Sequence, residues 1–458
     1  MSEIEGIRIL QVSIHGLIRG SDLELGRNAD TGGQTSYVVD LTSELGDCDG
    51  VARCVLLTRL IRDPEFSDDY ARASEKLGAH AGILRAECGP DGYIRKEELY
   101  PHLDGFARNA ILLLEAEGFR PDVVHGHYAD GAYVAEKLAG HYSVPWLYTG
   151  HSMGRNKREV LLGSGVDPAE LEQRYNLTHR IGIEENALRS ADLVLASTRY
   201  EIETGYEGYD ASGEANYRVV PPGIDLERFH PYYYDSDPGF NRPQEQIQAA
   251  GRMRDEISRF LTYPDKPLIL AISRPDQRKN IDGLVTAYGR DRELQAVANL
   301  AVFAGVRRDI ETMDDNEREV LTDLLLLMDR YDLYGLLALP KKHEPETDIP
   351  ELYRMAAHSR GVFINPALVE NFGITIIEAA ACGLPVIATD FGGPVDIIAN
   401  CDNGLLVDAK DEEAIRAALL RMLTDRDLWQ RSSENGVAGV RKHYSWSNHC
   451  AIYPELLH

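Results

Sequence analysis

The chain has 458 residues, a formal net charge of −26, 43% hydrophobic residues and 27% charged residues. This length exceeds what one ordinary hydrophobic core supports, so we expect two globular domains. The negative charge argues against nucleic acid as a main partner, because phosphate backbones need a basic face. No run of about 18 apolar residues occurs, so we expect no membrane span, and the acidic N-terminus does not resemble a secretory signal.

The six cysteines show no C-x-x-C spacing and are typical of thiols in a reducing cytoplasm, where we place the protein. The zinc motif H-E-x-x-H is absent, and so are the dinucleotide and P-loop fingerprints. We therefore predict no metal site and no separate cofactor.

The first half of the chain alternates predicted strands with predicted helices. Residues 7–14 read as a strand, and a long polar loop leads from there to Gly32 and Gly33 at the start of a helix. Adjacent glycines at a helix start let backbone amides approach an anion, although a flexible connector has the same pattern. Further strands are predicted at residues 54–58, 82–85, 122–125, 144–149, 193–197 and 217–220.

A second βα series begins after a stretch rich in Tyr, Asp and Pro. Its strands are predicted at residues 267–273, 300–304, 336–339, 362–364, 386–389 and 404–407. Alternating strands and helices predict an α/β fold of two doubly wound, Rossmann-like domains facing across a cleft. We place the domains at residues 1–226 and 227–441, with a C-terminal helix at 442–458 that returns to the first domain.

Polar residues follow two predicted strands of the second domain, where parallel sheets bind ligands. Two cations follow the strand at 267–273, and an acid and a glycine precede a helix that carries a second acid. Cations and free amides suit a departing diphosphate, and an acid suits a ribose diol. Each residue alone is more often a solvated loop charge; their shared placement favours a site. The residues are Arg274, Lys279, Glu370, Asn371, Phe372, Gly373, Ile374, Thr375 and Glu378.

The first domain carries a second basic set, formed by Lys96, Lys157 and Arg180. In a chain with so much negative charge, such a set indicates a small anionic substrate, although basic residues near Glu97 and Glu184 are also typical of surface ion pairs. A competing motif, Gly150 to Gly154, satisfies G-x-S-x-G and would make Ser152 a hydrolase nucleophile. The charged residues 155–159 that follow argue against the tightly packed helix that this motif requires.

Taken together, the chain resembles the retaining, two-domain GT-B glycosyltransferases of the sucrose-phosphate synthase and sucrose synthase group. The resemblance spans nearly the whole length. It is carried by HGLIRG at 15–20, DTGGQ at 30–34, HGHYAD at 125–130, TGHSMGR at 149–155, PPG at 221–223, RPDQRKN at 274–280, YDLYG at 331–335 and GVFINPA at 361–367.

The resemblance implies transfer of glucose from UDP-glucose to fructose 6-phosphate, giving sucrose 6-phosphate with the α configuration retained. The basic set matches the sugar-phosphate pocket of sucrose-phosphate synthases, which sucrose synthases lack; a sucrose synthase-like enzyme, or another sugar-phosphate acceptor, is the alternative. Asn371 stands where relatives usually have Pro or Ala, which bears on the choice of donor. No residue reads the base, so ADP- and GDP-sugars stay open beside UDP-glucose.

The resemblance also implies residue roles. Arg274 and Lys279 would hold the diphosphate, Glu378 the ribose, and Glu370 and His151 the glucosyl hydroxyls, so the implied catalytic residues are His151, Arg274, Lys279 and Glu370. Gly33 would contact donor and acceptor. The implied acceptor residues are Gly33, Gln34, Lys96, Tyr128, Lys157 and Arg180. The phosphatase-like region of the plant enzymes is not expected here, so a separate sucrose-phosphate phosphatase is the implied partner in sucrose biosynthesis.

Overall fold

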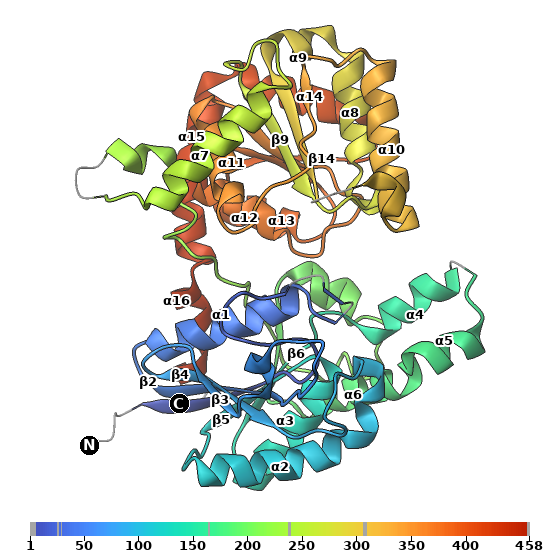
Figure 1. Cartoon of the computed structure of the whole chain (residues 1–458), viewed down its shortest axis with the longest axis vertical. Coiled ribbons are helices and arrows are strands. Elements are labelled where there is room, and N and C mark those ends of the chain that lie inside the picture. The colour runs from blue at the N-terminus through green and yellow to red at the C-terminus, as the bar shows by residue number, and fades with distance from the viewer. Residues whose placement is uncertain are drawn as a thin grey trace. The chain divides into compact units, whose positions relative to one another are not determined.

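The computed structural model of the chain describes residues 6–24, 27–28, 30–163, 165–236, 240–305 and 309–455. The chain divides into two compact units (Figure 1). Unit 1 comprises the residues up to Pro222 and those from Trp446 onward, and unit 2 is Gly223–Ser445. The sequence-based division lay at 226/227 and 441/442. Residues 456–458 of the predicted C-terminal helix lie outside the described residues.

Unit 1 is built on an eight-stranded sheet with the order β3-β4-β2-β1-β5-β6-β7-β8. Neighbouring strands are parallel except β3 and β4, an antiparallel pair at one edge that the sequence did not predict. All five residues of β5 are buried, as expected for a parallel strand covered on both faces. The strands are β1 (Ile7–Val12), β2 (Val51–Arg59), β3 (Ser74–Lys76), β4 (Ala81–Ala86), β5 (Val123–His127), β6 (Trp146–Thr149), β7 (Leu193–Ala196) and β8 (Tyr217–Val219).

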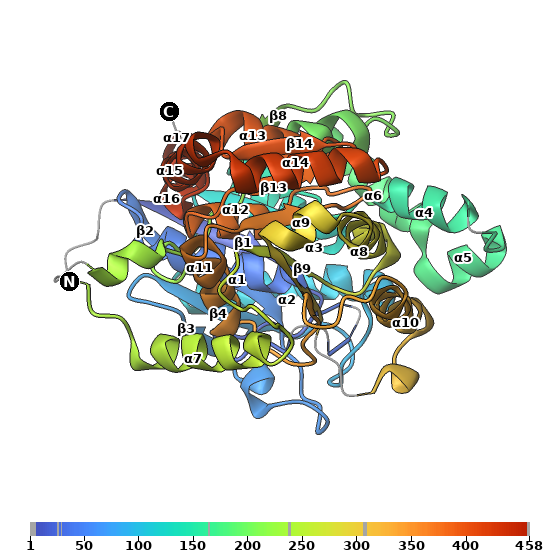
Figure 2. The same cartoon turned by 90° about the horizontal axis from the view of Figure 1, so that it is seen from above.

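Helices cover both faces of this sheet. The apolar residues of α2, α3 and α6 are buried on one face, and those of α1, α16 and α17 on the other. Helices α4 and α5 lie side by side at the edge of the unit (Figures 1 and 2). The helices are α1 (Gly33–Asp47), α2 (Leu103–Ala116), α3 (Tyr128–Tyr142), α4 (Gly154–Gly163), α5 (Pro168–Tyr175), α6 (Leu177–Ser190), α16 (Trp446–Cys450) and α17 (Ile452–Glu455), with short turns η1 (Asp68–Ala71), η2 (Lys96–Glu98), η3 (Tyr100–His102) and η4 (Glu201–Gly205).

Unit 2 is built on a six-stranded, all-parallel sheet with the order β11-β10-β9-β12-β13-β14. The apolar runs at its centre are buried throughout, which fits strands covered on both faces. The strands are β9 (Leu268–Ser273), β10 (Asn299–Ala304), β11 (Leu337–Ala338), β12 (Val362–Asn365), β13 (Val386–Thr389) and β14 (Gly404–Val407).

Helices also cover both faces of the unit 2 sheet. Residues of α7, α11, α12 and α13 form the apolar core on one face, and residues of α8, α9, α10 and α14 form it on the other. Helix α7 packs beside α11 (Figure 2). The helices are α7 (Gln244–Ser258), α8 (Ile281–Arg290), α9 (Arg292–Val297), α10 (Asp315–Arg330), α11 (Asp348–His358), α12 (Ile374–Ala381), α13 (Pro394–Cys401), α14 (Glu412–Thr424) and α15 (Arg426–His443), with turns η5 (Tyr232–Ser236), η6 (Gln277–Lys279) and η7 (Ile310–Thr312).

In each sheet, the chain adds strands in one direction and then in the other, and the two directions meet at one adjacent parallel pair. The pair is β1 and β5 in unit 1, and β9 and β12 in unit 2. Doubly wound sheets bind ligands outside the carboxyl ends of the strands at such a reversal. The predicted fold class, two doubly wound α/β domains, is confirmed, and the loops after these four strands are the places to look for a site.

Within the described part of the chain, the structure has no helix that is both long enough and apolar enough to cross a membrane.

Candidate active site

In unit 2, the structure brings Lys279 and Glu370 together. Lys279 follows β9 and Glu370 follows β12, and the ammonium Nζ lies 2.7 Å from carboxylate Oε2. Asn365, the last residue of β12, donates its side-chain amide to the same oxygen at 3.1 Å. The loops meet because β9 and β12 are adjacent and parallel. Glu370 is therefore held in one orientation at the carboxyl end of the sheet.

The start of α12 is an open helix N-terminus beside this pair. Gly373 precedes the helix with φ of 100°, and a Cβ there would lie 2.7 Å from Ile376 Cδ1, so the position requires glycine. The N-cap residue Gly373 has no side chain to cap the helix, and the first-turn amides of Ile374 and Thr375 suit an anion. Asn371 and Phe372 form the approach to this turn.

Two further predicted donor residues lie on the same two segments, Arg274 after β9 and Glu378 within α12. Arg274 is exposed after β9. The pKa of Asp276 is lowered to about 2, mainly by the hydrogen bond from Arg278, and the charge of Arg274 adds to this shift. Glu378 lies one turn into α12 and accepts a hydrogen bond from Tyr353 Oη at 3.0 Å. Burial raises the pKa of Glu378 to about 7. This carboxyl therefore changes charge near neutral pH.

In unit 1, each of the three predicted cations has its own acidic neighbour. Lys96 Nζ lies 2.7 Å from Asp30 Oδ1, and Arg180 Nε lies 2.8 Å from Glu184 Oε1. Lys157 Nζ is 3.8 Å from Glu97 Oε1. Lys157 is thus the cation with the weakest pairing of the three, because its acid stands beyond hydrogen-bond distance.

The three cations are close enough to act on one another. Burial lowers the pKa of Lys157 to about 8, and repulsion from Lys96 and Arg180 contributes to the shift. Arg180 also lies over the ring of Tyr128, with 4.2 Å between Cζ and the ring centre. Together these residues form a basic cluster, defined here as Lys96, Lys157 and Arg180, that would stabilise a multiply charged anion.

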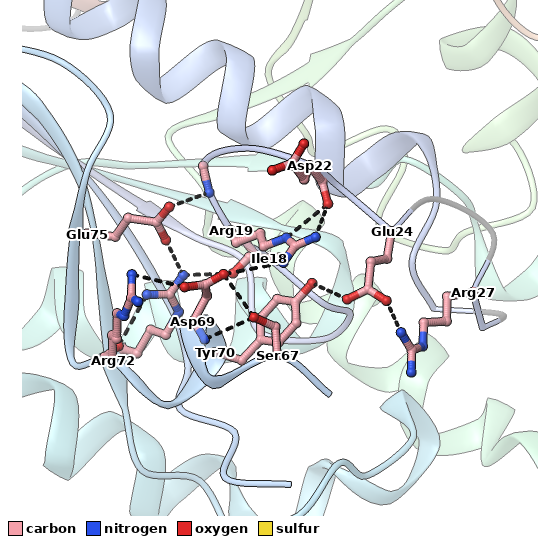
Figure 3. Close-up of polar contacts among 12 residues, drawn as sticks. Ile18, Arg19, Asp22, Glu24, Arg27, Ser67, Asp69, Tyr70, Arg72 and Glu75 are labelled. Atoms are coloured by element: carbon pink, nitrogen blue, oxygen red, sulfur yellow. Dashed lines mark hydrogen bonds and ion pairs between the residues drawn. The ribbon is translucent and has the colours of Figure 1, made fainter. Parts of the chain in front are cut away.

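The loop between β1 and α1 is tied to the edge of the sheet by charged side chains (Figure 3). The Arg85 guanidinium, whose side chain is fully buried, donates to the Ile18 carbonyl at 3.0 Å and pairs with Glu75 at 2.5 Å. The other oxygen of Glu75 accepts the Gly20 amide at 2.8 Å. These hydrogen bonds and this ion pair fix the path of the loop that leads to α1.

At the end of that loop, Gly33 and Gln34 begin α1. A Cβ on Gly33 would meet no atom within 4 Å, so the space before the helix is open. Gln34 donates its side-chain amide to Ser13 Oγ at 3.2 Å, which places it against the end of β1. Both predicted residues lie at the carboxyl end of the unit 1 sheet.

His151 follows β6 in a left-handed conformation, with φ of 56°. Its Nε2 lies 3.0 Å from Nδ1 of His127, the last residue of β5. A non-glycine residue in this conformation is uncommon and is found at ligand sites. His151 therefore adjoins the start of α3, where Tyr128 lies, and its ring is 5.1 Å from the ring of Tyr37 on α1.

Two family models match the chain, one after the other. "Sucrose synthase first GT-B domain" matches residues 4–243, more than half of the chain, and "Glycosyl transferases group 1" matches residues 253–438. The chain belongs to the sucrose synthase GT-B family of glycosyltransferases. The family predicted from the sequence motifs is thereby confirmed.

Relatives that are named sucrose-phosphate synthases are similar in sequence to this chain along nearly all of its length. Probable sucrose-phosphate synthase 1 of Oryza sativa subsp. indica is 42% identical over 97% of this chain and 45% of its own length. Sucrose-phosphate synthase of Zea mays is 42% identical over 97% of this chain and 46% of its own length. The chain thus spans less than half the length of these two relatives. The solved sucrose-phosphate synthase of Thermosynechococcus elongatus matches with a TM-score of 0.69 at 25% identity, over 98% of both chains.

The structure supports the argument against a serine hydrolase. The charged residues 155–159 lie in α4, Gly154–Gly163, but Gly154 is its only buried residue, so the helix is not the tightly packed one that the motif requires. Ser152 Oγ instead lies 3.2 Å from Arg180 Nη2, which donates to it, and the left-handed residue of the motif is His151. Among the described residues, no histidine hydrogen-bonds Ser152, so the described geometry lacks the base that a nucleophilic serine needs.

Several residues that organise this GT-B site were not singled out from the sequence. Asp130 accepts from the backbone amide of His15 at 3.2 Å and lies 2.9 Å from its ring Nδ1, which joins the loops after β1 and β5. Glu184 was named only as a surface ion-pair residue, whereas its pair with Arg180, four residues earlier on α6, is buried; the helical spacing was the available signal for the pairing. Within the described residues no group of three or more His, Cys, Asp or Glu could hold a metal ion.

Proposed function

We propose that the chain transfers glucose from UDP-glucose to the 2-hydroxyl of fructose 6-phosphate, forming sucrose 6-phosphate and UDP with the α configuration retained. The observation that carries the proposal is the basic cluster of Lys96, Lys157 and Arg180 in unit 1. An acceptor without a phosphate would bring no anion to Lys157, whose nearest acid, Glu97, stands 3.8 Å away.

The cluster supports a phosphorylated acceptor on electrostatic grounds. A phosphate supplies close to two negative charges at neutral pH and several acceptor oxygens. Lys157 has a pKa lowered to about 8 by burial and by its cationic neighbours, so an added dianion relieves an existing repulsion. The fixed guanidinium of Arg180 offers further donors for a planar or forked contact.

Unit 2 supplies the groups that a nucleotide sugar requires. Lys279, Arg274 and the amides at the start of α12 would stabilise the diphosphate as it gains charge. Glu370, oriented by Lys279 and Asn365, would accept hydrogen bonds from glucosyl hydroxyls. Glu378 would accept the ribose hydroxyls. From unit 1, His151 would contact the glucosyl C6 hydroxyl.

In the proposed reaction, the bond between glucosyl C1 and the phosphate oxygen breaks. A new bond forms between C1 and the acceptor 2-oxygen on the same face of the sugar. The leaving phosphate oxygen takes the proton of the acceptor hydroxyl, so atoms and charge balance without a covalent glycosyl-enzyme intermediate. The protein contributes orientation and stabilisation of the leaving diphosphate.

The test is an assay of the purified chain with UDP-glucose and either fructose 6-phosphate or fructose, with products identified by mass spectrometry and proton NMR. We expect sucrose 6-phosphate with an α-glucosidic linkage and little transfer to fructose. Equal or better transfer to fructose would overturn the proposed acceptor. Parallel reactions with ADP-glucose and GDP-glucose test the base.

A further inference from the structure

A buried chain of hydrogen bonds connects the C-terminal helix α17 with His151. It begins at Tyr453, whose hydroxyl lies 3.4 Å from Gln11 Nε2. Gln11 Oε1 lies 2.6 Å from His127 Nε2, and His127 Nδ1 lies 3.0 Å from His151 Nε2. Tyr453, Gln11 and His127 are all fully buried. Solvent therefore does not compete for these contacts.

With the Gln11 amide in the orientation that the structure gives it, the positions of the protons follow along this chain. Gln11 Oε1 can only accept, so His127 Nε2 carries a proton. Burial lowers the pKa of His127 well below its usual value, so the ring is neutral and Nδ1 has no proton. That atom must accept from His151 Nε2. Burial also lowers the pKa of His151 to about 3, so His151 is neutral and its Nδ1 is left as an acceptor.

The orientation of the Gln11 amide decides this order, and Tyr453 holds the orientation. Tyr453 Oη lies 2.9 Å from His125 Nδ1, and His125 Nε2 lies 2.8 Å from Thr149 Oγ1. When Tyr453 donates its proton to His125 Nδ1, its oxygen accepts from the Gln11 amide nitrogen, which lies 3.4 Å away. Loss of this hydroxyl would free the amide to flip, which would place its NH₂ against His127 and reverse the protons along the chain.

The helix that carries Tyr453 follows a segment that is itself anchored in unit 1. His449 lies on α16, which packs against α1. Its Nδ1 donates to the Pro221 carbonyl at 3.0 Å, and its Nε2 accepts from Tyr37 Oη at 3.2 Å. The Tyr37 ring in turn lies 5.1 Å from the ring of His151. The C-terminal segment therefore contacts Tyr37, and the ring of Tyr37 packs against His151.

We propose that Tyr453 is a positioning residue that holds His151 in the Nε2-protonated form, so that its Nδ1 accepts a hydrogen bond from a hydroxyl of the transferred sugar. The inference rests on the proposed function for the identity of the sugar, whereas the tautomer is a property of the free chain. A network that only stabilised the fold would leave sugar discrimination untouched.

The first test measures the tautomer in the unmodified chain. Nitrogen-15 and proton correlation spectra of histidine-labelled protein, assigned with His151→Asn, distinguish the two neutral imidazole forms and the imidazolium. We expect the Nε2-protonated form of His151 throughout the range of about pH 6 to 8. An Nδ1-protonated or doubly protonated ring would overturn the proposal.

The second test compares Tyr453→Phe with Tyr148→Phe. Tyr148 is a buried tyrosine of the same unit whose hydroxyl has no hydrogen-bond partner within the described residues, so its loss controls for removal of a buried oxygen. We expect Tyr453→Phe to show mixed tautomers of His151. Its kcat/KM for UDP-glucose should fall roughly two- to tenfold, as for a lost hydrogen bond, with kcat/KM for UDP-6-deoxyglucose unchanged. Tyr148→Phe should change neither quantity.

The outcomes distinguish failure of the positioning role of Tyr453 from failure of the proposed glucosyl transfer. An equal loss with both donors, or an unchanged tautomer in Tyr453→Phe, would refute the positioning role. Absence of transfer by the unmodified chain would refute the proposed function and the sugar contact, while the spectra would still confirm or refute the tautomer.

Discussion

The guanidinium of Arg180 donates through Nε to Glu184 Oε1 at 2.8 Å, and the two side chains are only 3% and 0% exposed. Arg180 also donates to the Ser152 carbonyl at 2.6 Å, while Glu184 accepts the Gly154 amide at 3.1 Å. Burial acts to lower the pKa of Arg180, but Glu184 raises it above its usual value. Arg180 is therefore a permanently charged group with a fixed orientation at the loop after β6.

Glu184→Gln should destabilise unit 1, because it leaves the buried charge of Arg180 without its counter-ion. Removal of one partner of a buried ion pair costs about 3–5 kcal/mol. Urea unfolding followed by tryptophan fluorescence measures the change. The matched control is Glu115→Gln, an exposed acid of the same unit, which should change stability by less than about 0.5 kcal/mol. Equal effects of the two substitutions would contradict the role assigned to the buried pair.

Lys157→Ala should weaken the acceptor far more than the donor. A charge-assisted contact to phosphate contributes about 1.5–3 kcal/mol, so we expect KM for fructose 6-phosphate to rise roughly 10- to 100-fold. KM for UDP-glucose should change little. Lys137→Ala is the control, since Lys137 is an exposed lysine on α3 that pairs with Asp104 at 3.1 Å. A similar rise in KM for both substrates would count against the basic cluster as the acceptor site.

The pKa of Lys157 predicts that KM for fructose 6-phosphate depends on pH. Its pKa is lowered to about 8, so Lys157 is cationic below that pH and loses its charge as pH rises through it. The phosphate of the acceptor stays dianionic over this range, because its second pKa is about 6. KM for fructose 6-phosphate should therefore increase from neutral pH to about pH 9. Initial rates across this range check the trend, and in Lys157→Ala the increase should vanish.

Lys279→Ala should lower kcat more than it raises either KM. It removes a cation from the proposed leaving diphosphate and releases Glu370 from its 2.7 Å contact. Loss of one group that stabilises developing charge reduces kcat by about 100- to 1000-fold. Steady-state rates of UDP release measure the change. Lys266→Ala, which removes a contact to the Gln295 carbonyl elsewhere in unit 2, should be close to the unmodified chain. An unchanged kcat would rule out the proposed role.

Glu378 predicts a pH dependence of donor binding with the opposite sign. Its pKa is raised to about 7 by burial, so it ionises as pH rises through neutrality and becomes a stronger acceptor for the ribose hydroxyls. KM for UDP-glucose should fall from about pH 6 to 8. Tyr353→Phe removes the hydrogen bond that opposes this shift, so the midpoint should move to higher pH. A midpoint that moves to lower pH would contradict the assignment to Glu378.

Much of the fold follows from local pattern. The predicted strands at 386–389 and 404–407 coincide with β13 and β14, because each apolar run starts at Pro385 or Gly404 and is followed by an aspartate, Asp390 or Asp408. The closeness of Lys279 and Glu370 was also predictable, because the carboxyl ends of adjacent parallel strands share one edge of a sheet. The charged helix α4 was missed, because apolar periodicity is weak where a helix lies at the edge of a unit.

The sequence by itself determined the fold class, the GT-B family and the loops that carry the candidate site, because strand and helix periodicity and contiguous motifs are local properties of the chain. Only the tertiary structure decided which acid faces which cation and which groups contact His151. His15 and Asp130 are separated by 115 positions, and Gln11 and Tyr453 by 442, yet each pair is in contact. Burial then sets the pKa values of Lys157, His151 and Glu378, and burial exists only once the chain has folded.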